Sequence, residues 1–225
     1  SECDLLLAVG VRFSDRATGD LNEYTKKCMT VHIDIDRAEI GKNVSPDVSL
    51  WGDVKEILTK ILEELPEERH PEWVSELEGY KNEMILPAPK PYGPEAIIEE
   101  VHRHCTEDTV VATDVGQHQM LTSQYVDITE NRQIIMSGGL GTMGYGLPGA
   151  IGAKIGNPDK PVIAISGDGG MQMNIQELAT AVLEELPVIL CIFNNEYLGM
   201  VRQWQKLFYG KRYSMTNCLL YTSPS

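Results

Sequence analysis

The sequence predicts an α/β fold in which parallel β-sheets are flanked by helices. Short apolar runs rich in Leu, Val and Ile recur along the chain and end in Gly or Asp, which is typical of buried parallel strands. Segments with a helical spacing of apolar residues lie between these runs. Because the two kinds of segment alternate regularly, we expect parallel sheets that are covered on both faces.

The composition agrees with a folded protein of this class. The 225 residues leave room for one large domain or two small ones, and a hydrophobic content of 42% argues against disorder. The five cysteines have no paired short spacing, so neither a zinc site nor a disulfide framework is indicated. A reducing, cytoplasmic location fits this use of cysteine.

The net charge and the hydropathy of the chain argue against nucleic acid and membranes as binding partners. The 33 Asp and Glu residues outnumber the 19 Lys and Arg residues, and the net charge of −14 repels nucleic-acid phosphates and anionic lipids. No run of about 18 apolar residues could span a bilayer. We therefore expect neither nucleic acid nor membrane as a partner. A bound anion would need backbone N–H groups, local positive charge or a metal ion.

Residues 1–65 show half of an α/β pattern. Apolar runs at 4–10 and 29–35 predict strands, and a helical spacing of apolar residues predicts a helix over 54–65. The chain starts without Met and enters a strand-like run at once, so we expect it to be part of a longer protein. Residues 66–93 are expected to be a linker, because prolines are frequent there and only a short helix near 73–84 is indicated.

Residues 94–217 carry the fuller pattern and are expected to be a second domain. Residues 218–225 have no helix or strand signal and stay unassigned. The predicted helices lie at 94–105, 117–125, 143–155 and 174–184, and the predicted strands at 109–113, 133–136, 161–166 and 187–193.

The clearest chemical signal is Gly167-Asp168-Gly169-Gly170, which follows a predicted strand. Ligands of open α/β sheets bind at the carboxyl ends of strands, where glycines allow a close approach to the backbone. A polar pair, Asn194-Asn195, follows the next predicted strand. The 27 positions from Asp168 to Asn195 accommodate a helix and a return strand, so we expect both side chains at one edge of adjacent strands.

A carboxylate together with an amide carbonyl is a hard-oxygen set suited to Mg²⁺, which also takes up phosphate oxygens. The expected ligand is therefore a diphosphate, to which the N–H groups of Gly169 and Gly170 would donate beside a helix start. Gly-Asp-Gly alone is a common turn, and Asn-Asn is an ordinary strand end. Only their order and spacing make the pattern specific.

This combination resembles the fingerprint of the thiamine-diphosphate enzymes: Gly-Asp-Gly, some two dozen residues, then Asn-Asn. The resemblance implies that Asp168, Asn195 and the main-chain carbonyl of Tyr197 are Mg²⁺ ligands. It also implies that the diphosphate is lined by Gly167, Gly169 and Gly170.

Two further segments resemble the acetohydroxyacid synthase (acetolactate synthase) family. Residues 115–120 match its diphosphate pocket, which implies cofactor contacts for Val115, Gly116, Gln117 and His118. Residues 137–148 match its glycine-rich segment, which implies that Gly141 and Met143 lie at the cofactor, with Met143 beneath it. A helix cap for His118 and a core position for Met143 remain the simpler alternatives.

The resemblance continues on both sides of these segments and covers residues 1–217. Residues 200–205 resemble a helix beside the substrate channel, with Met200 and Trp204 at its entrance, although an amphipathic helix with an aromatic stripe is the alternative. Residues 11–19 and 32–36 resemble a central FAD-binding domain. This implies FAD contacts for Arg12, Asp34 and Asp53 and a position near the active-site mouth for Arg16, unless these residues form salt bridges at helix starts.

The activity implied by the resemblance is decarboxylation of pyruvate and its ligation to a second 2-oxo acid. The products would be 2-acetolactate or 2-aceto-2-hydroxybutyrate, in branched-chain amino acid biosynthesis. The implied assembly is a homodimer or tetramer with the active site between subunits, and a regulatory small subunit is a further implied partner. The activating glutamate lies outside this chain, so the isolated fragment is expected to be inactive. Glyoxylate carboligase, pyruvate oxidase and a non-catalytic nucleotide-binding fragment stay open as alternatives.

Overall fold

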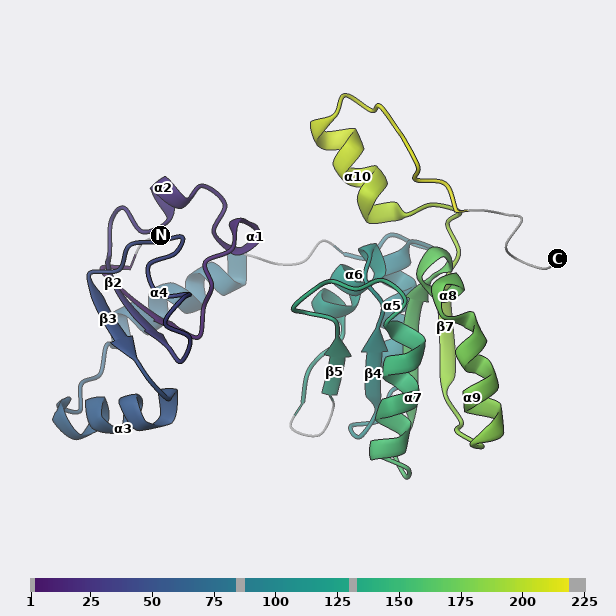
Figure 1. The fold of residues 1–225 in the computed structure, drawn as a ribbon, viewed down its shortest axis with the longest axis horizontal. Helices are drawn as coiled ribbons and strands as arrows, with labels where there is room; N and C mark the ends of the chain where they lie inside the picture. The colour runs from purple at the N-terminus through teal and green to yellow at the C-terminus, as the bar shows by residue number, and fades with distance from the viewer. Residues whose placement is uncertain (1–2, 84–87, 130–132, 219–225) are drawn as a thin grey trace. The chain divides into compact units, whose positions relative to one another are not determined.

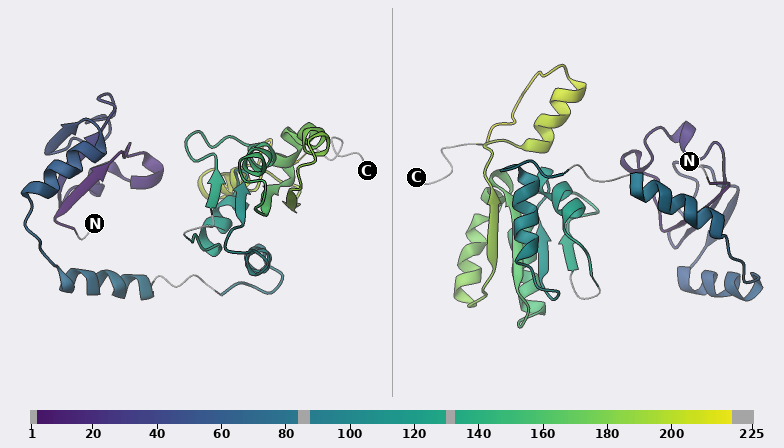
Figure 2. Two further views of the ribbon diagram at one scale, coloured as in Figure 1. Left: turned by 90° about the horizontal axis from the view of Figure 1, so that it is seen from below. Right: turned by 180° about the vertical axis from the view of Figure 1, so that it is seen from behind.

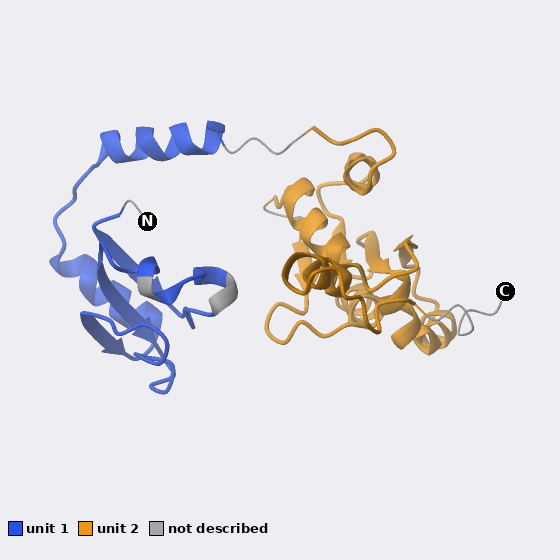
Figure 3. Ribbon diagram, turned by 90° about the horizontal axis from the view of Figure 1, so that it is seen from above, with its two compact units in different colours: residues 1–83 blue, residues 84–225 orange. Residues whose placement is uncertain are grey.

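The computed structural model describes residues 3–83, 88–129 and 133–218. The chain divides into two compact units, residues 1–83 and 84–225 (Figure 3). The division falls within residues 66–93, for which the sequence predicts a linker. No helix in the described ranges is long and apolar enough to cross a membrane.

The first unit contains a three-stranded parallel sheet. Its strands β1 (Leu5–Val9), β2 (Met29–Asp34) and β3 (Val48–Trp51) lie side by side in that order. The first two confirm the strands predicted at 4–10 and 29–35. A small core of Ala8, Phe13 and Val44 packs beside the sheet. The unit also contains α1 (Asp15–Thr18), α2 (Leu21–Tyr24), α3 (Val54–Glu64) and α4 (Pro71–Glu83).

The second unit contains a four-stranded parallel sheet in the order β5-β4-β6-β7. The chain passes from β4 outward to β5 and then returns to the other side of β4. This reversal creates a crevice at the carboxyl ends of β4 and β6, the usual ligand position in such sheets. The strands are β4 (Val110–Thr113), β5 (Gln133–Met136), β6 (Val162–Gly167) and β7 (Ile189–Phe193).

Helices cover both faces of this sheet, as the continuous apolar strands require (Figures 1 and 2). Alternate residues of β4 and β6 point to opposite faces. Val111, Ile163 and Ile165 pack with α5 (Pro94–Arg103) and α6 (Gln117–Tyr125). Val110, Ala112 and Ala164 pack with α7 (Gly146–Gly156) on the other face, where α9 (Leu178–Leu183) also lies. The remaining helices are α8 (Asp168–Met173), the 3₁₀ turn η1 (Ile175–Glu177) and α10 (Gly199–Phe208).

Two stretches differ from the predicted helices. The helix expected from Met143 begins at Gly146, because residues 143 and 144 form a turn in which Gly144 has a φ of +83°. The helix expected over 174–184 is present as the 3₁₀ turn η1 followed by α9, and Asn174, whose φ of −134° is not helical, separates it from α8. The chain is already helical from Asp168 to Met173, directly after the strand. Both differences bring helix starts to the carboxyl edge of the sheet.

Candidate cofactor site

A cavity of about 690 Å³ opens at the carboxyl edge of the second unit's sheet. It lies at the switch point between β4 and β6, where the topology predicts a ligand. All twelve residues of this unit that the sequence assigns to the cofactor or to its metal line this cavity, and so does Met200; of the residues predicted for this site, Trp204 does not. In chain order they are Val115, Gly116, Gln117, His118, Gly141, Met143, Gly167, Asp168, Gly169, Gly170, Asn195, Tyr197 and Met200.

Asp168 and Asn195 follow adjacent strands. Gly167, the last residue of β6, is in register with Phe193, the last residue of β7. Asp168 opens α8, and Asn195 follows β7 by two residues. The parallel pairing therefore places both residues at one edge of the sheet, as their spacing predicts, and both line the same cavity.

The side chains of this pair differ in their hydrogen bonding. Asp168 Oδ1 is buried and has no hydrogen-bond partner in the described part of the chain. Asn195 Oδ1 accepts from the N–H of Tyr197 at 3.0 Å, which forms a tight turn after β7. The thiol of Cys218 donates a hydrogen bond to the Asp168 carboxylate. Burial, together with this hydrogen bond and the charge of Asp168, raises the pKa of Cys218 to about 11. A buried carboxylate oxygen without a donor is costly unless a cation or donor binds there.

His118 adds a neutral ring to the same wall. The residue is 8% exposed, and its Nε2 atom has no hydrogen-bond partner within the described residues. Burial lowers the pKa of His118, although the nearby carboxylates of Asp114 and Asp168 act in the opposite direction. The imidazole is thus favoured in its neutral form, in which one ring nitrogen donates a hydrogen bond and the other accepts one.

Close packing explains two of the glycines in the cavity wall. A Cβ atom at Gly116 would lie 2.6 Å from the His118 ring, and one at Gly169 would lie 2.7 Å from Leu198. Any larger residue would displace these neighbours. Gly169 also stands in the first turn of α8, where backbone N–H groups have no partner within the helix and can meet an anion.

A buried carboxylate that sequence reasoning missed supports this wall. Asp114 directly follows β4 and is fully buried. Its position after an apolar strand repeats that of Asp168 after β6, and this was the signal that could have identified it. The carboxylate accepts N–H bonds from Val115 at 2.6 Å and from Gly144 and Gly146 at 3.0 Å each.

The helix α10 borders the cavity through one of its two predicted residues. Met200 lines the cavity, whereas Trp204 does not and instead packs on Phe208 with ring centroids 4.9 Å apart. Arg202 lies between the rings of Tyr197 and Tyr213, at 4.1 and 4.0 Å from their centroids. This stacking joins the turn after β7 to α10 and to the segment that follows it.

The residues predicted to contact FAD lie in the first unit, at the carboxyl ends of its three strands. Arg12 follows β1, Asp34 ends β2 and Asp53 follows β3. Asp34 Oδ1 accepts from the N–H of Asp36 at 2.8 Å. Asp53 caps α3, because its side chain accepts hydrogen bonds from the backbone N–H groups of Lys55 and Glu56. Asp53 therefore stabilises a helix start, as the alternative to FAD binding expected, but it does so by backbone hydrogen bonds and not by a salt bridge. The side chain of Arg16 lies outside what the structure describes.

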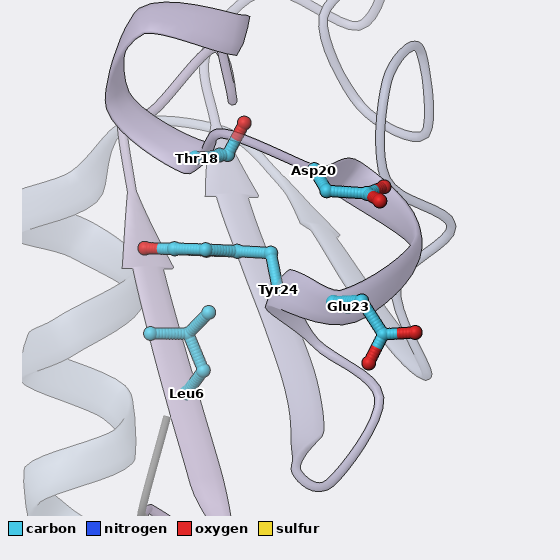
Figure 4. A pocket seen from close by; sticks show the side chains of 5 residues that line it. All are labelled: Leu6, Thr18, Asp20, Glu23 and Tyr24. Carbon is cyan, nitrogen blue, oxygen red and sulfur yellow. The ribbon is translucent and has the colours of Figure 1, made fainter.

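A hollow of about 500 Å³ in this unit does not involve the predicted FAD residues. It is lined by Leu6, Thr18, Asp20, Glu23 and Tyr24. The Tyr24 ring extends over Leu6, whereas the carboxylates of Asp20 and Glu23 point away from the tyrosine hydroxyl (Figure 4). Its polar groups therefore do not converge on a common ligand.

Comparison with known families agrees with the site in the second unit. Residues 114–223 match the C-terminal TPP binding domain of thiamine pyrophosphate enzymes, and residues 1–61 match the central domain of the same enzymes. The chain therefore belongs to the thiamine pyrophosphate enzymes. Thiamine pyrophosphate, or thiamine diphosphate, is the cofactor that the matched C-terminal domain binds.

Within this class the chain is similar to acetolactate synthase large subunits. It is 43% identical over 237 residues to a probable acetolactate synthase large subunit of Methanococcus aeolicus, with 96% of the chain and 40% of the relative covered. The identity is 45% over 226 residues with the large subunit of Corynebacterium glutamicum (95% of the chain, 36% of the relative). It is 42% over 223 residues with the isozyme 3 large subunit of Escherichia coli (95% and 39%). The chain thus spans about two fifths of the length of these curated relatives.

Proposed function

We propose that this chain is the central and cofactor-binding part of an acetolactate synthase large subunit. The reaction would decarboxylate pyruvate and join it to a second 2-oxo acid, giving 2-acetolactate or 2-aceto-2-hydroxybutyrate. The observation that carries the proposal is the placement of Asp168 and Asn195 after adjacent strands, in one cavity, with Asp168 Oδ1 buried and without a hydrogen-bond partner among the described residues.

These donors fit a magnesium diphosphate. Asp168 would supply the carboxylate, Asn195 the amide oxygen and Tyr197 the main-chain carbonyl, leaving other positions of Mg²⁺ for phosphate oxygens and water. The N–H groups at the start of α8, from Gly169 and Gly170, would donate to the diphosphate. A strongly acidic chain can hold an anion in this way, because metal and backbone dipoles supply the positive potential.

The other lining residues would orient the cofactor and keep water away from it. When bound, thiamine diphosphate supplies the electron sink for decarboxylation and carbon–carbon bond formation. Gln117 would donate a hydrogen bond to a phosphate oxygen, and the neutral ring of His118 would contact the diphosphate. Met143, Leu121 and Met200 give the cavity an apolar wall, which strengthens polar interactions by excluding solvent.

The first unit would bind FAD at the carboxyl edge of its sheet. Arg12, Asp34 and Asp53 stand at the ends of three adjacent parallel strands, the position that nucleotides take in such sheets. Asp34 would accept from a ribose hydroxyl. Flavin fluorescence titration of the chain tests this assignment: Asp34→Ala should weaken FAD binding, and an unchanged affinity would contradict it.

The remaining expectations concern the whole protein. A homodimer or tetramer would complete the active site between subunits, and a regulatory small subunit would be a further partner. Arg16 and Trp204 would lie near the mouth of the substrate channel in that assembly. The proposed location is the cytoplasm.

Two measurements test the proposal. Calorimetric titration of the chain with thiamine diphosphate should show binding that requires Mg²⁺ and is lost in Asp168→Ala. The full-length protein that contains this chain should form acetolactate from pyruvate, detected as acetoin by colour after acidification. Metal-independent binding would contradict the site, whereas acetyl phosphate or acetate as the only product would contradict the reaction.

A further inference from the structure

Asp114 is a charged side chain for which the proposed cofactor chemistry has no direct use. It is fully buried, and it forms no ion pair with any described residue. Burial of a carboxylate without a cation is unfavourable unless N–H donors compensate the charge. Here three backbone N–H groups do so, from Val115, Gly144 and Gly146.

Two of these donors lie far along the chain, in the turn before α7. Gly144 donates to Asp114 Oδ1 and Gly146 to Asp114 Oδ2, both at 3.0 Å. The opposite side of the same turn is held by Asn174, whose Nδ2 donates to the Gly144 carbonyl at 2.8 Å. Both polar groups of Gly144 are therefore bonded to side chains at the carboxyl edge of the sheet.

The turn held in this way carries part of the cavity wall. Met143 lies in this turn and Gly141 just before it, and both residues line the cavity. Gly144 has a φ of +83°, and a Cβ atom there would lie 2.7 Å from Asn174 Nδ2, so the turn closely fits its two supports. A Cβ atom at Gly170 would lie 2.7 Å from the Asp114 carboxyl carbon, so Asp114 also packs on the first turn of α8.

We propose that Asp114, together with Asn174, is a positioning residue that holds Met143 and Gly141 against the cofactor cavity. The two residues touch no predicted ligand and act through the backbone of Gly144 and Gly146. The inference rests on the proposed function, since it takes the cavity as the thiamine diphosphate site. If Asp114 and Asn174 no longer hold the turn, the contacts to the thiamine part of the cofactor should weaken, whereas those to the diphosphate should not.

Isosteric replacement tests this role. Asp114→Asn keeps the shape that packs on Gly170, but it turns one acceptor oxygen into a donor that faces a backbone N–H group. The affinities of the full chain for thiamine diphosphate and for inorganic pyrophosphate are measured by calorimetry with Mg²⁺ saturating. Asp114→Asn should weaken thiamine diphosphate about tenfold or more and pyrophosphate less than about threefold, because pyrophosphate needs only the metal and α8.

A second variant keeps the test decisive if Asp114→Asn does not fold, as judged by circular dichroism. Asn174→Ala removes only the hydrogen bond to the Gly144 carbonyl. It should change the ratio of the thiamine diphosphate affinity to the pyrophosphate affinity in the same direction, by a smaller factor. Asn157→Ala is the matched control. It removes the hydrogen bond that the Asn157 side-chain amide donates to the Ala153 carbonyl at the far end of α7, and it should leave the ratio of the two affinities unchanged.

The outcomes are separable. A wild-type chain that binds neither ligand would overturn the proposed function and this inference with it. A wild-type chain that binds both, with an unchanged ratio in Asp114→Asn and Asn174→Ala, would overturn the positioning role alone. Equal wild-type affinity for the two ligands would also overturn it, because the Met143 segment would then contribute nothing to binding.

Discussion

The side-chain amide of Gln117 donates to Gln203 Oε1 at 2.8 Å and thereby joins the start of α6 to the middle of α10. The two residues are 86 positions apart, and both line the cofactor cavity. A Cβ atom at Gly199 would lie 2.4 Å from Gln117 Oε1, so the start of α10 also packs closely on this amide. The geometry of α10 at the cavity therefore depends on a residue of α6.

We expect the Gln117 and Gln203 side chains to be energetically coupled. A double-mutant cycle of Gln117→Ala and Gln203→Ala, measured by urea unfolding, should give a coupling of about 1 kcal/mol, the usual net value of such a hydrogen bond. Thiamine diphosphate affinity should fall more in Gln117→Ala than in Gln203→Ala, because only Gln117 is predicted to reach the phosphates. Additive losses of stability would refute the coupling.

The two predicted metal ligands should differ in importance. Asp168→Ala removes the only predicted carboxylate and should weaken Mg²⁺-dependent binding of thiamine diphosphate more than Asn195→Ala, which removes a neutral donor. EDTA should abolish binding to the wild-type chain, and added Mg²⁺ should restore it. Asp159→Ala, which changes an exposed aspartate at the amino-terminal side of β6, is the control and should bind normally. A larger loss in Asn195→Ala would contradict the assignment.

Stacking of Arg202 should stabilise the turn that carries Tyr197. Arg202→Leu removes both cation–π contacts and should cost about 1 kcal/mol of stability at this partly exposed position. Because the Tyr197 carbonyl is a predicted metal ligand, Mg²⁺ affinity should fall as well. Tyr213→Phe keeps the ring and serves as the control, with little change expected in either quantity. An unchanged Mg²⁺ affinity in Arg202→Leu would show that the stacking does not support the metal site.

The thiol of Cys191 should make folding sensitive to alkaline pH. Burial raises the pKa of Cys191 above its ordinary value of 9.0. A group whose folded-state pKa is raised contributes stability that is present below the unfolded-state pKa, here about pH 9, and is lost as the pH rises through the folded-state pKa. Cys191→Val removes this titration while it keeps an apolar side chain in β7. Urea unfolding at pH 7.5 and pH 10 should show a smaller alkaline loss in the variant than in the wild type, and equal losses would contradict the prediction.

Local sequence patterns determined the strands and the sheet edge at which the predicted metal ligands lie. The apolar runs before Asp168 and Asn194 are short and continuous, which identifies buried parallel strands. The spacing of Asp168 and Asn195 allows one crossover, and parallel crossovers return to the same sheet edge. Thus the neighbourhood of Asp168 and Asn195 could be predicted, because it follows from strand direction alone.

The tertiary structure decided how the walls of the site are held. Asp114 follows an apolar strand as Asp168 does, but the sequence does not show that Gly144 and Gly146, some thirty positions later, donate to its carboxylate. The late start of α7 has the same origin, since the N–H groups of Gly144 and Gly146 bond to the distant Asp114 side chain. Trp204 packs on Phe208 and does not line the cavity. The helical spacing of apolar residues predicts which side chains share one face of α10, but it does not predict which part of the protein that face contacts. Hydrogen bonds between residues far apart in the chain leave no periodic signal in the sequence, so only the folded structure shows them.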